Sequence, residues 1–203
     1  MRGRTSKANP WADHYTRKAR EEGYAARSVY KLEEIQRRYR VIRPGDRVLD
    51  MGCAPGGWLQ LAARLTGAAG RVVGVDLNPV AIRLPDHVQT LVGDLEHPAA
   101  EVEAALAAGF DVVLSDMAPA TTGHGPTDAA RSFNLAAAAL ETARRHLKAG
   151  GAMVCKIFQG PDDGLFGQRM QAVFDEVRRF RPQSSRKASR EIFFIGKGKQ
   201  REA

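Results

Sequence analysis

Short apolar runs alternate with helical patterns over residues 48–195, and this alternation constrains the fold more than any other feature of the chain. Runs of strand length occupy 47–50, 71–75, 88–92, 110–114, 152–157 and 192–195, and 180–183 is a candidate for one more short strand. Helical patterns occupy 59–65, 99–108, 129–147 and 165–179. Strands that alternate with helices form right-handed βαβ units. The sequence therefore predicts an α/β fold, with a mostly parallel sheet covered by helices on both faces.

Two further helices are predicted ahead of the first strand. Asn9 followed by Pro10 is typical of a helix start, with an N-cap residue and then proline at the first helical position. Apolar residues recur at three-residue spacing from Val29 to Ile35. This spacing indicates a helix over 28–39 with one buried stripe, and Lys31 lies off that stripe.

The basic charge lies at the two ends of the chain. Residues 1–47 carry 13 Lys and Arg against 6 Asp and Glu, a net charge of +7, and residues 178–203 carry 9 against 2, again +7. The middle, 48–177, has 9 against 15, a net charge of −6. Clustered basic charge at a pI near 9.9 is typical of a surface that binds a polyanion. The alternative is solvated charge that keeps the protein soluble. The acidic middle favours a small ligand that is neutral or cationic.

The length of 203 residues fits one globular domain. We expect a single domain over 1–203, with a basic helical extension at about 1–46 and a flexible basic tail at about 197–203. There is no run of eighteen apolar residues, which excludes a membrane span, and 1–15 has no apolar core of a secretory signal. We therefore expect a cytoplasmic protein.

The cysteines and histidines indicate neither a disulfide framework nor a metal site. Cys53 and Cys155 are too few for either a set of disulfides or a four-thiolate site. The five histidines show neither metal-ligand spacing nor a Ser-His-Asp pattern. We expect no metal, and we interpret both cysteines as small buried thiols.

Acidic residues end four consecutive predicted strands. These residues are Asp50, Asp76, Asp94 and Asp116, and Lys156 follows on the fifth strand. In parallel sheets, ligands bind outside the carboxyl ends of the strands. Aspartate is also common in turns and helix caps, so a purely structural role is the alternative for each one. As a set, they predict a ligand site at this edge of the sheet.

A glycine-rich loop follows the first strand, from Gly52 to Trp58. It lacks the Gly-Lys-Ser/Thr of a phosphate-binding P-loop and does not fit the G-x-G-x-x-G of a dinucleotide site. Pro55 stiffens the turn, and Trp58 offers a flat apolar wall. A carboxylate at the end of the second strand, here Asp76, can accept hydrogen bonds from both ribose hydroxyls of a nucleoside. S-adenosylmethionine is a nucleoside without phosphates that carries a positive charge, so it suits an acidic site of this kind.

These motifs together resemble the FtsJ/RrmJ family of ribose 2′-O-methyltransferases. The matching stretches are Ser28–Ile35, Leu49–Trp58, Val75–Leu77, Gly93–Asp94, Leu114–Pro119, Lys156–Gly160 and Ser184–Glu191. They follow the family order from about residue 11 to 196 and so cover nearly the whole chain. The departures are Cys53, where a small residue such as alanine is usual, and a slightly longer segment between Asp76 and Asp94.

The resemblance implies a seven-stranded Rossmann-like methyltransferase fold whose last strand inserts antiparallel. It implies a catalytic tetrad of Lys31, Asp116, Lys156 and Glu191. It implies an S-adenosylmethionine site at Gly56, Trp58, Asp76, Asp94 and Asp116. The implied substrate is the 2′-OH of a uridine in the A-loop of 23S rRNA, within the large ribosomal subunit. We expect a monomer without membrane contacts.

Three alternatives remain open from the sequence. Lys156 could accept the proton of the 2′-OH, or it could only orient that hydroxyl. The tetrad could be two ion pairs that hold the sheet to the N-terminal helix. The chain could also methylate tRNA, or bind RNA during ribosome assembly without catalysis.

Overall fold

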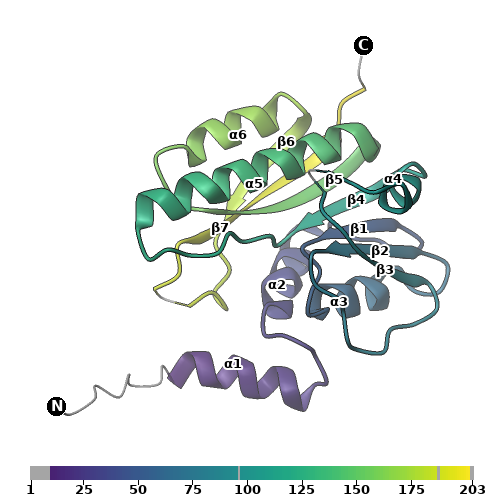
Figure 1. The fold of residues 1–203 in the computed structure, drawn as a ribbon, viewed down its shortest axis with the longest axis horizontal. Coiled ribbons are helices and arrows are strands. Elements are labelled where there is room, and N and C mark those ends of the chain that lie inside the picture. Colours follow the sequence, from purple (N-terminus) through teal and green to yellow (C-terminus); the bar gives the residue numbers. More distant parts are fainter. Residues whose placement is uncertain (1–9, 96, 187, 202–203) are drawn as a thin grey trace.

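The described residues of the computed structural model, 10–95, 97–186 and 188–201, contain one seven-stranded sheet (Figure 1). Its strands are β1 (Arg47–Met51), β2 (Arg71–Asp76), β3 (Val88–Val92), β4 (Phe110–Ser115), β5 (Leu147–Phe158), β6 (Phe174–Phe180) and β7 (Glu191–Lys199). They lie in the order β3-β2-β1-β4-β5-β7-β6. Strands β1 to β5 run parallel, and β7 inserts antiparallel between β5 and β6. The predicted architecture, including the antiparallel last strand, is confirmed.

Helices cover both faces of the sheet, as the βαβ order predicts. They are α1 (Pro10–Glu21), α2 (Val29–Tyr39), α3 (Gly57–Thr66), α4 (Ala100–Leu106), α5 (Gly125–His146) and α6 (Asp163–Gln171). One buried cluster joins α2 and α3 to the sheet, and a second joins α4, α5 and α6 to it (Figure 1). In β1, Val48 belongs to the first cluster and Leu49 to the second, because successive side chains of a strand point to opposite faces.

Helix α1 packs on the α2 side of the molecule through aromatic contacts. The rings of Tyr15 and Tyr30 lie 5.3 Å apart between centroids, and Ala19 is buried. Pro10 is the first residue of α1, as predicted, whereas Asn9 lies outside the described residues. Among the described residues, no helix combines the length and apolarity that a membrane crossing needs.

The register of the parallel strands aligns their carboxyl ends. Met51 pairs with Val75 on one side and with Ser115 on the other, and Ser115 pairs in turn with Cys155. The residues that follow this row are Gly52, Asp76, Asp116 and Lys156. The register therefore brings a glycine turn, two carboxylates and an amine together at one edge of the sheet.

The helix predicted over 165–179 is wrong in its second half. Helix α6 ends at Gln171, and 174–180 forms the edge strand β6, paired with β7 alone among the described strands. The mixed apolar and charged residues of this segment resemble a helical pattern. An edge strand shows the same mixture, because its charged residues face solvent while Phe174 packs on Gly196. The candidate strand at 180–183 is also wrong, because the strand in this region lies earlier in the chain and ends at Phe180.

Two other boundaries differ from the prediction, at the start of the fifth strand and at the start of the long helix. Strand β5 begins at Leu147 rather than Ala152, because Gly150, with φ +79°, lets the chain pass through an irregularity in the β4–β5 pairing. The long helix begins at Gly125 rather than Ala129, with a proline in its first turn.

Candidate active site

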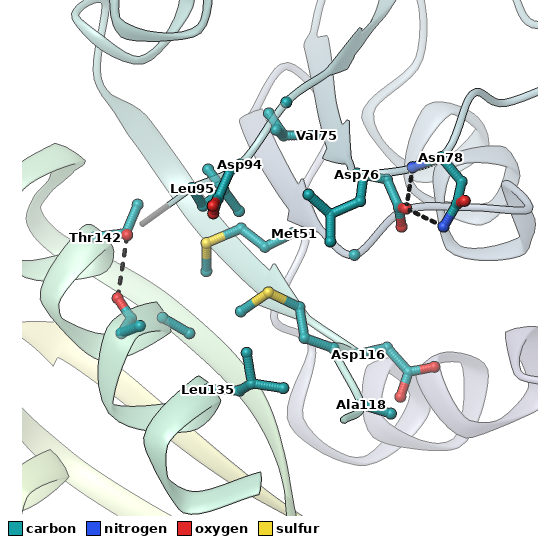
Figure 2. Close-up of a pocket in the computed structure, with 16 residues that line it drawn as sticks. Met51, Val75, Asp76, Asn78, Asp94, Leu95, Asp116, Ala118, Leu135 and Thr142 are labelled. Atoms are coloured by element: carbon teal, nitrogen blue, oxygen red, sulfur yellow. Dashed lines mark hydrogen bonds between the residues drawn. The ribbon is translucent and has the colours of Figure 1, made fainter. Parts of the chain in front are cut away.

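A pocket of about 320 Å³ opens at the carboxyl ends of β1, β2, β3 and β4 (Figure 2). Its lining includes three carboxylates from three strand ends, Asp76, Asp94 and Asp116, and apolar walls from Met51 and Leu135. Its described lining contains no lysine, arginine or histidine. A concave site with apolar walls and a few convergent polar groups is typical of a small-molecule site. Its negative charge suits a cationic ligand.

Two positions of the loop require glycine for backbone conformation and for space. Gly52 has φ +75°, and a Cβ built there would lie 2.7 Å from Cγ of Met117. Gly56 has φ +114°, and its Cβ would lie 2.6 Å from Cδ1 of Ile82. Side chains at these positions would be strained and would fill the turn. The glycines therefore let the loop pass close to Met117, which follows β4, and to Ile82, which follows β2.

Asp76 is held by the backbone on both of its carboxylate oxygens. Oδ2 accepts a hydrogen bond from Ala54 N at 3.0 Å. Oδ1 accepts one from Asn78 N at 2.8 Å (Figure 2). The side-chain Nδ2 of Asn78 donates to Oδ1 as well, at 3.2 Å. A carboxylate has about four acceptor positions, so the fixed group keeps capacity for one further donor. A ribose hydroxyl is such a donor.

The pocket lining also includes a carboxylate that follows β3 and an exposed apolar side chain. Asp94 follows β3, and its Oδ2 lies 3.4 Å from Nδ1 of His97. Leu77 lines the same pocket and is 70% exposed. Leu77 was not among the predicted site residues. The one sequence signal for it is its position as an apolar residue between two polar turn residues, Asp76 and Asn78. A flat aromatic ligand would find an apolar surface there.

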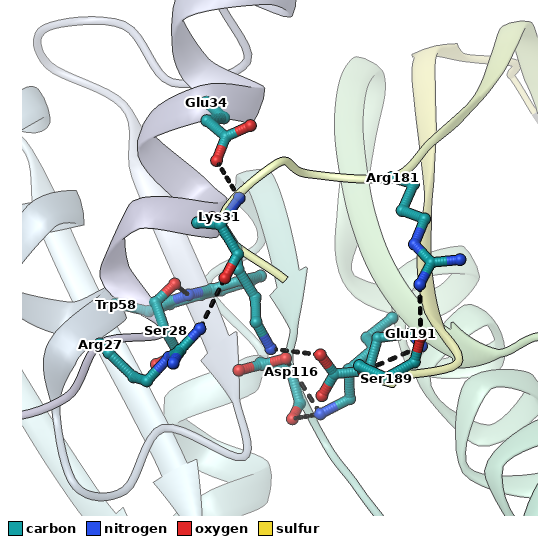
Figure 3. Close-up of polar contacts among 11 residues, drawn as sticks. Arg27, Ser28, Lys31, Glu34, Trp58, Asp116, Arg181, Ser189 and Glu191 are labelled. Carbon is teal, nitrogen blue, oxygen red and sulfur yellow. Dashed lines mark hydrogen bonds and ion pairs between the residues drawn. The ribbon is translucent and has the colours of Figure 1, made fainter. Parts of the chain in front are cut away.

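Trp58 does not border this pocket in the described structure. Its indole is buried against Phe193 with 6.0 Å between ring centroids, and Nε1 donates to Ser28 O at 2.9 Å. Gly56 likewise faces Ile82 rather than the pocket lining. The predicted cofactor contacts of these two residues therefore stay predictions. Trp58 fixes the start of α3 against α2, as Figure 3 also shows.

The four residues of the predicted tetrad form two adjacent ion pairs beside the pocket. Lys31 Nζ lies 2.7 Å from Glu191 Oε2, and Lys156 Nζ lies 3.0 Å from Asp116 Oδ1. The Lys156 amine also donates a hydrogen bond to the Asp116 carbonyl oxygen at 2.5 Å, and the buried Oδ1 meets the amine as an ion pair without a hydrogen bond of its own among the described residues. Figure 3 shows Lys31 reaching from α2 toward Glu191 and Asp116.

Burial makes these pairs unlike ordinary surface ion pairs. Lys31 is 8% exposed and Lys156 is 4% exposed. Burial alone would raise the pKa of Glu191, but the charge and hydrogen bond of Lys31 outweigh it, so this pKa lies below its ordinary value. Lys31 lies off the apolar stripe of α2, as predicted, yet it is buried, because the start of β7 lies against it. The structure thus brings together all four tetrad residues.

Asp50 differs from the other strand-end carboxylates. The sequence placed it at the ligand edge, but it is fully buried inside β1, and neither of its oxygens has a hydrogen-bond partner among the described residues. Burial, followed by the charges of Asp116 and Asp76, raises the pKa of Asp50 well above its ordinary value. The prediction that Asp50 belongs to the ligand edge is therefore wrong.

Both cysteines are buried, as predicted. Burial raises the pKa of the Cys155 thiol to about 12, and burial followed by the charge of Asp50 raises that of Cys53. Thiols with raised pKa values are poor nucleophiles near neutral pH. The chemistry of the site therefore falls to its lysines and carboxylates.

Residues 24–199 match the FtsJ-like methyltransferase family. The chain belongs to this family. Among curated relatives, it is 52% identical over 200 residues to "Ribosomal RNA large subunit methyltransferase E" of Desulforapulum autotrophicum, covering 98% of both chains. It is 46% identical over 190 residues to the protein of the same name from Bdellovibrio bacteriovorus, covering 93% of this chain and 97% of that one.

Solved structures share the fold of this FtsJ-like chain at lower identity. A Plasmodium falciparum protein described as a ribosomal RNA methyltransferase has a TM-score of 0.77 and 23% identity, over 88% of this chain and all of that one. Fibrillarin of Aeropyrum pernix, solved with bound S-adenosyl-L-methionine, has a TM-score of 0.55 and 19% identity, over 77% of this chain and 68% of that one. The expected Rossmann-like methyltransferase fold and the family resemblance are confirmed.

Proposed function

We propose that this chain transfers a methyl group from S-adenosylmethionine to the ribose 2′-OH of a uridine in the A-loop of 23S rRNA, within the large ribosomal subunit. The observation that carries the proposal is the position of Lys156. Its buried amine contacts Asp116, and Asp116 also lines the acidic pocket. The Lys156 amine, a candidate general base, thus lies next to a pocket suited to a cationic nucleoside. The names of the rRNA-modifying relatives support the substrate class.

The residues of the pocket fit S-adenosylmethionine. Asp76 would bind a ribose hydroxyl, and Asp94 with Leu77 would border the adenine. The acidic lining would favour the positive charge of the ligand. When bound, S-adenosylmethionine supplies an electrophilic methyl group on a sulfonium.

The chain's own contribution is alignment and proton handling. Lys156 would act as the neutral amine: its lone pair would accept a hydrogen bond from the 2′-OH and take up that proton as the oxygen is methylated, which leaves an ammonium paired with Asp116. The Asp116 carbonyl and carboxylate fix the direction of the nitrogen. Glu191 would keep Lys31 in place beside them. Holding reacting groups in line supplies a large share of the acceleration in group-transfer reactions. The rigid, buried side chains of the tetrad suit that role.

The basic ends of the chain suit an RNA partner. The segments 1–47 and 178–203, each with a net charge of +7, include α2 and β7, which carry Lys31 and Glu191. Phosphate neutralisation by lysine and arginine dominates nucleic-acid affinity. The acidic cofactor pocket and the basic flanks thus separate two ligands of opposite charge.

Transfer of a radiolabelled methyl group tests this function. Large ribosomal subunits from a strain that lacks the gene are incubated with the enzyme, alongside free 23S rRNA and tRNA, and the label is mapped after nuclease digestion. We expect label on one uridine ribose of 23S rRNA, with the large subunit as the better substrate. Label in tRNA or on a base would overturn the proposed substrate, and an absence of label from every RNA would overturn the reaction.

A further inference from the structure

A second pocket, of about 420 Å³, lies on the other side of the tetrad from the acidic one. Lys31 and Glu191 line it, whereas Asp116 lines the acidic pocket, and the two pockets share no described lining residue. The tetrad thus separates a pocket suited to a methyl donor from a second space open to an acceptor. The remaining described residues that bound the second space are Arg27, Ser28, Arg186, Ala188 and Ser189.

The charge of the second pocket is positive. Arg27, Lys31 and Arg186 line it, and the one carboxylate in its described lining, Glu191, is bound to Lys31 at 2.7 Å. The two guanidinium groups therefore carry the excess charge. They are close enough to affect one another: burial, and then the charge of Arg186, lower the pKa of Arg27.

The fold holds these two arginines together although 158 residues separate them in the sequence. Arg27 donates from Nη2 to Ser184 O at 2.6 Å. The Glu34 carboxylate accepts hydrogen bonds from the backbone N–H of Gln183 and Ser184, at 2.7 and 2.8 Å. The loop that carries Arg186 is thereby anchored to α2 and to the segment before it (Figure 3). The Ser184 carbonyl and the Glu34 carboxylate thus help to hold the positively charged Arg27 and Arg186 near each other. An anion between the two guanidinium groups would offset their electrostatic repulsion.

We propose that Arg27 and Arg186 together bind one backbone phosphate of the RNA strand, next to the ribose whose 2′-OH meets Lys156. Guanidinium groups recognise phosphate oxygens through paired N–H donors, which gives direction as well as affinity. The phosphate contact would fix the register of the strand, so that one ribose reaches the tetrad. This inference rests on the proposed function, because it takes RNA as the acceptor.

Binding of large ribosomal subunits at several salt concentrations tests the pair. The variants are Arg27→Gln, Arg186→Gln and the double variant, and Arg71→Gln is the matched control, since Arg71 is exposed at the amino end of β2. We expect each single variant to weaken binding about tenfold or more, as for a lost charged hydrogen bond. We expect the log–log salt slope to fall by about 0.7, the value for one phosphate on single-stranded RNA. The double variant should lose no more slope than either single variant, because one phosphate is shared.

Arg186→Gln is the decisive variant, because Arg186 is exposed and its replacement leaves the anchors of the loop intact. Unchanged affinity and slope in Arg186→Gln would overturn the inference. A slope loss near 1.4 in the double variant would also overturn it, since that value means two separate phosphates. S-adenosylmethionine affinity should stay within twofold in all variants. Binding does not depend on turnover, so a wild-type enzyme that binds the subunit without methylating it would refute the proposed function alone.

Discussion

Lys156 Nζ lies 3.0 Å from Oδ1 of Asp116, and Asp116 is the residue through which the tetrad borders the acidic pocket. The contact arises from the register of β4 and β5, which pairs Ser115 with Cys155 and so sets the following two residues side by side. A buried amine, 4% exposed, is therefore placed by the sheet itself beside a carboxylate of the pocket lining.

Asp76 should control cofactor affinity. Asp76→Ala removes the carboxylate that would accept from the ribose, at a cost of about 1.5–3 kcal/mol for each charge-assisted hydrogen bond. This corresponds to about tenfold to 150-fold weaker binding in calorimetric titration with S-adenosylmethionine. Asp86→Ala, in the exposed loop before β3, is the control and should bind as the wild type does. Unchanged affinity in Asp76→Ala would remove Asp76 from the site.

Glu191 should stabilise the fold in a pH-dependent way. Glu191→Gln leaves Lys31 buried without a carboxylate, which should lower the free energy of unfolding by about 1–3 kcal/mol at pH 7. The pKa of Glu191 is depressed in the folded state, so its contribution is present above the unfolded value of about 4.3 and is lost as the pH falls through the lower native pKa.

Urea unfolding of wild type and Glu191→Gln from pH 7 down to pH 3 checks this. The difference between the two proteins should shrink across the acid range. Glu141→Gln, which removes an exposed carboxylate paired with Arg144 and Arg145, should change stability by less than about 0.5 kcal/mol. A stability difference for Glu191→Gln that does not vary with pH would contradict a charged Glu191.

Asp50 should have the opposite effect on stability. Its folded pKa lies above the unfolded value, so stability falls as the pH rises through the interval between the two. Asp50→Asn removes this penalty and should raise the unfolding free energy at pH 7, with little change near pH 4. The measurement is thermal unfolding without cofactor at both pH values.

Asp111→Asn is the matched control for Asp50. Asp111 pairs with Lys148 at 2.8 Å. Burial alone would raise the pKa of Asp111, but the hydrogen bonds that it accepts from the Lys148 amine and the Arg47 backbone N–H, together with the positive charges of both residues, lower this pKa below its ordinary value. Its replacement should therefore destabilise the protein at neutral pH. If both asparagine variants were destabilising at pH 7, Asp50 would be a charged residue with a partner.

The sheet could be predicted because local rules govern it. Strand runs, glycine turns and terminal aspartates all lie within a few residues of one another, and parallel register then aligns Asp76 with Asp116 at one edge. Edge strand β6 could not be predicted, because exposed charged residues on an edge strand resemble those on a helix. The burial of Asp50 could not be predicted either, since a shift of one residue along a strand changes whether a side chain lies at the ligand edge or in the interior.

The site was predicted in part. The tetrad followed from motif resemblance, but no local pattern indicates that Lys31 meets Glu191 across 160 residues. That contact depends on α2 packing against the antiparallel strand β7. The second pocket was not predicted for the same reason, because Arg27 and Arg186 come together through contacts such as the hydrogen bonds from Gln183 and Ser184 to Glu34. Tertiary packing, rather than sequence spacing, creates both features.

The most direct test of the account is single-turnover methyl transfer by Lys156→Ala and Lys156→Arg, with S-adenosylmethionine affinity measured in parallel. Lys156→Ala should abolish methyl transfer while cofactor and RNA affinity stay within about threefold, a difference under about 1 kcal/mol. Lys156→Arg should fail as well, because a guanidinium does not release its proton in this pH range and its fork is wider than an ammonium. Near-normal turnover in Lys156→Arg would contradict proton transfer to Lys156 and leave it a fixed positive charge.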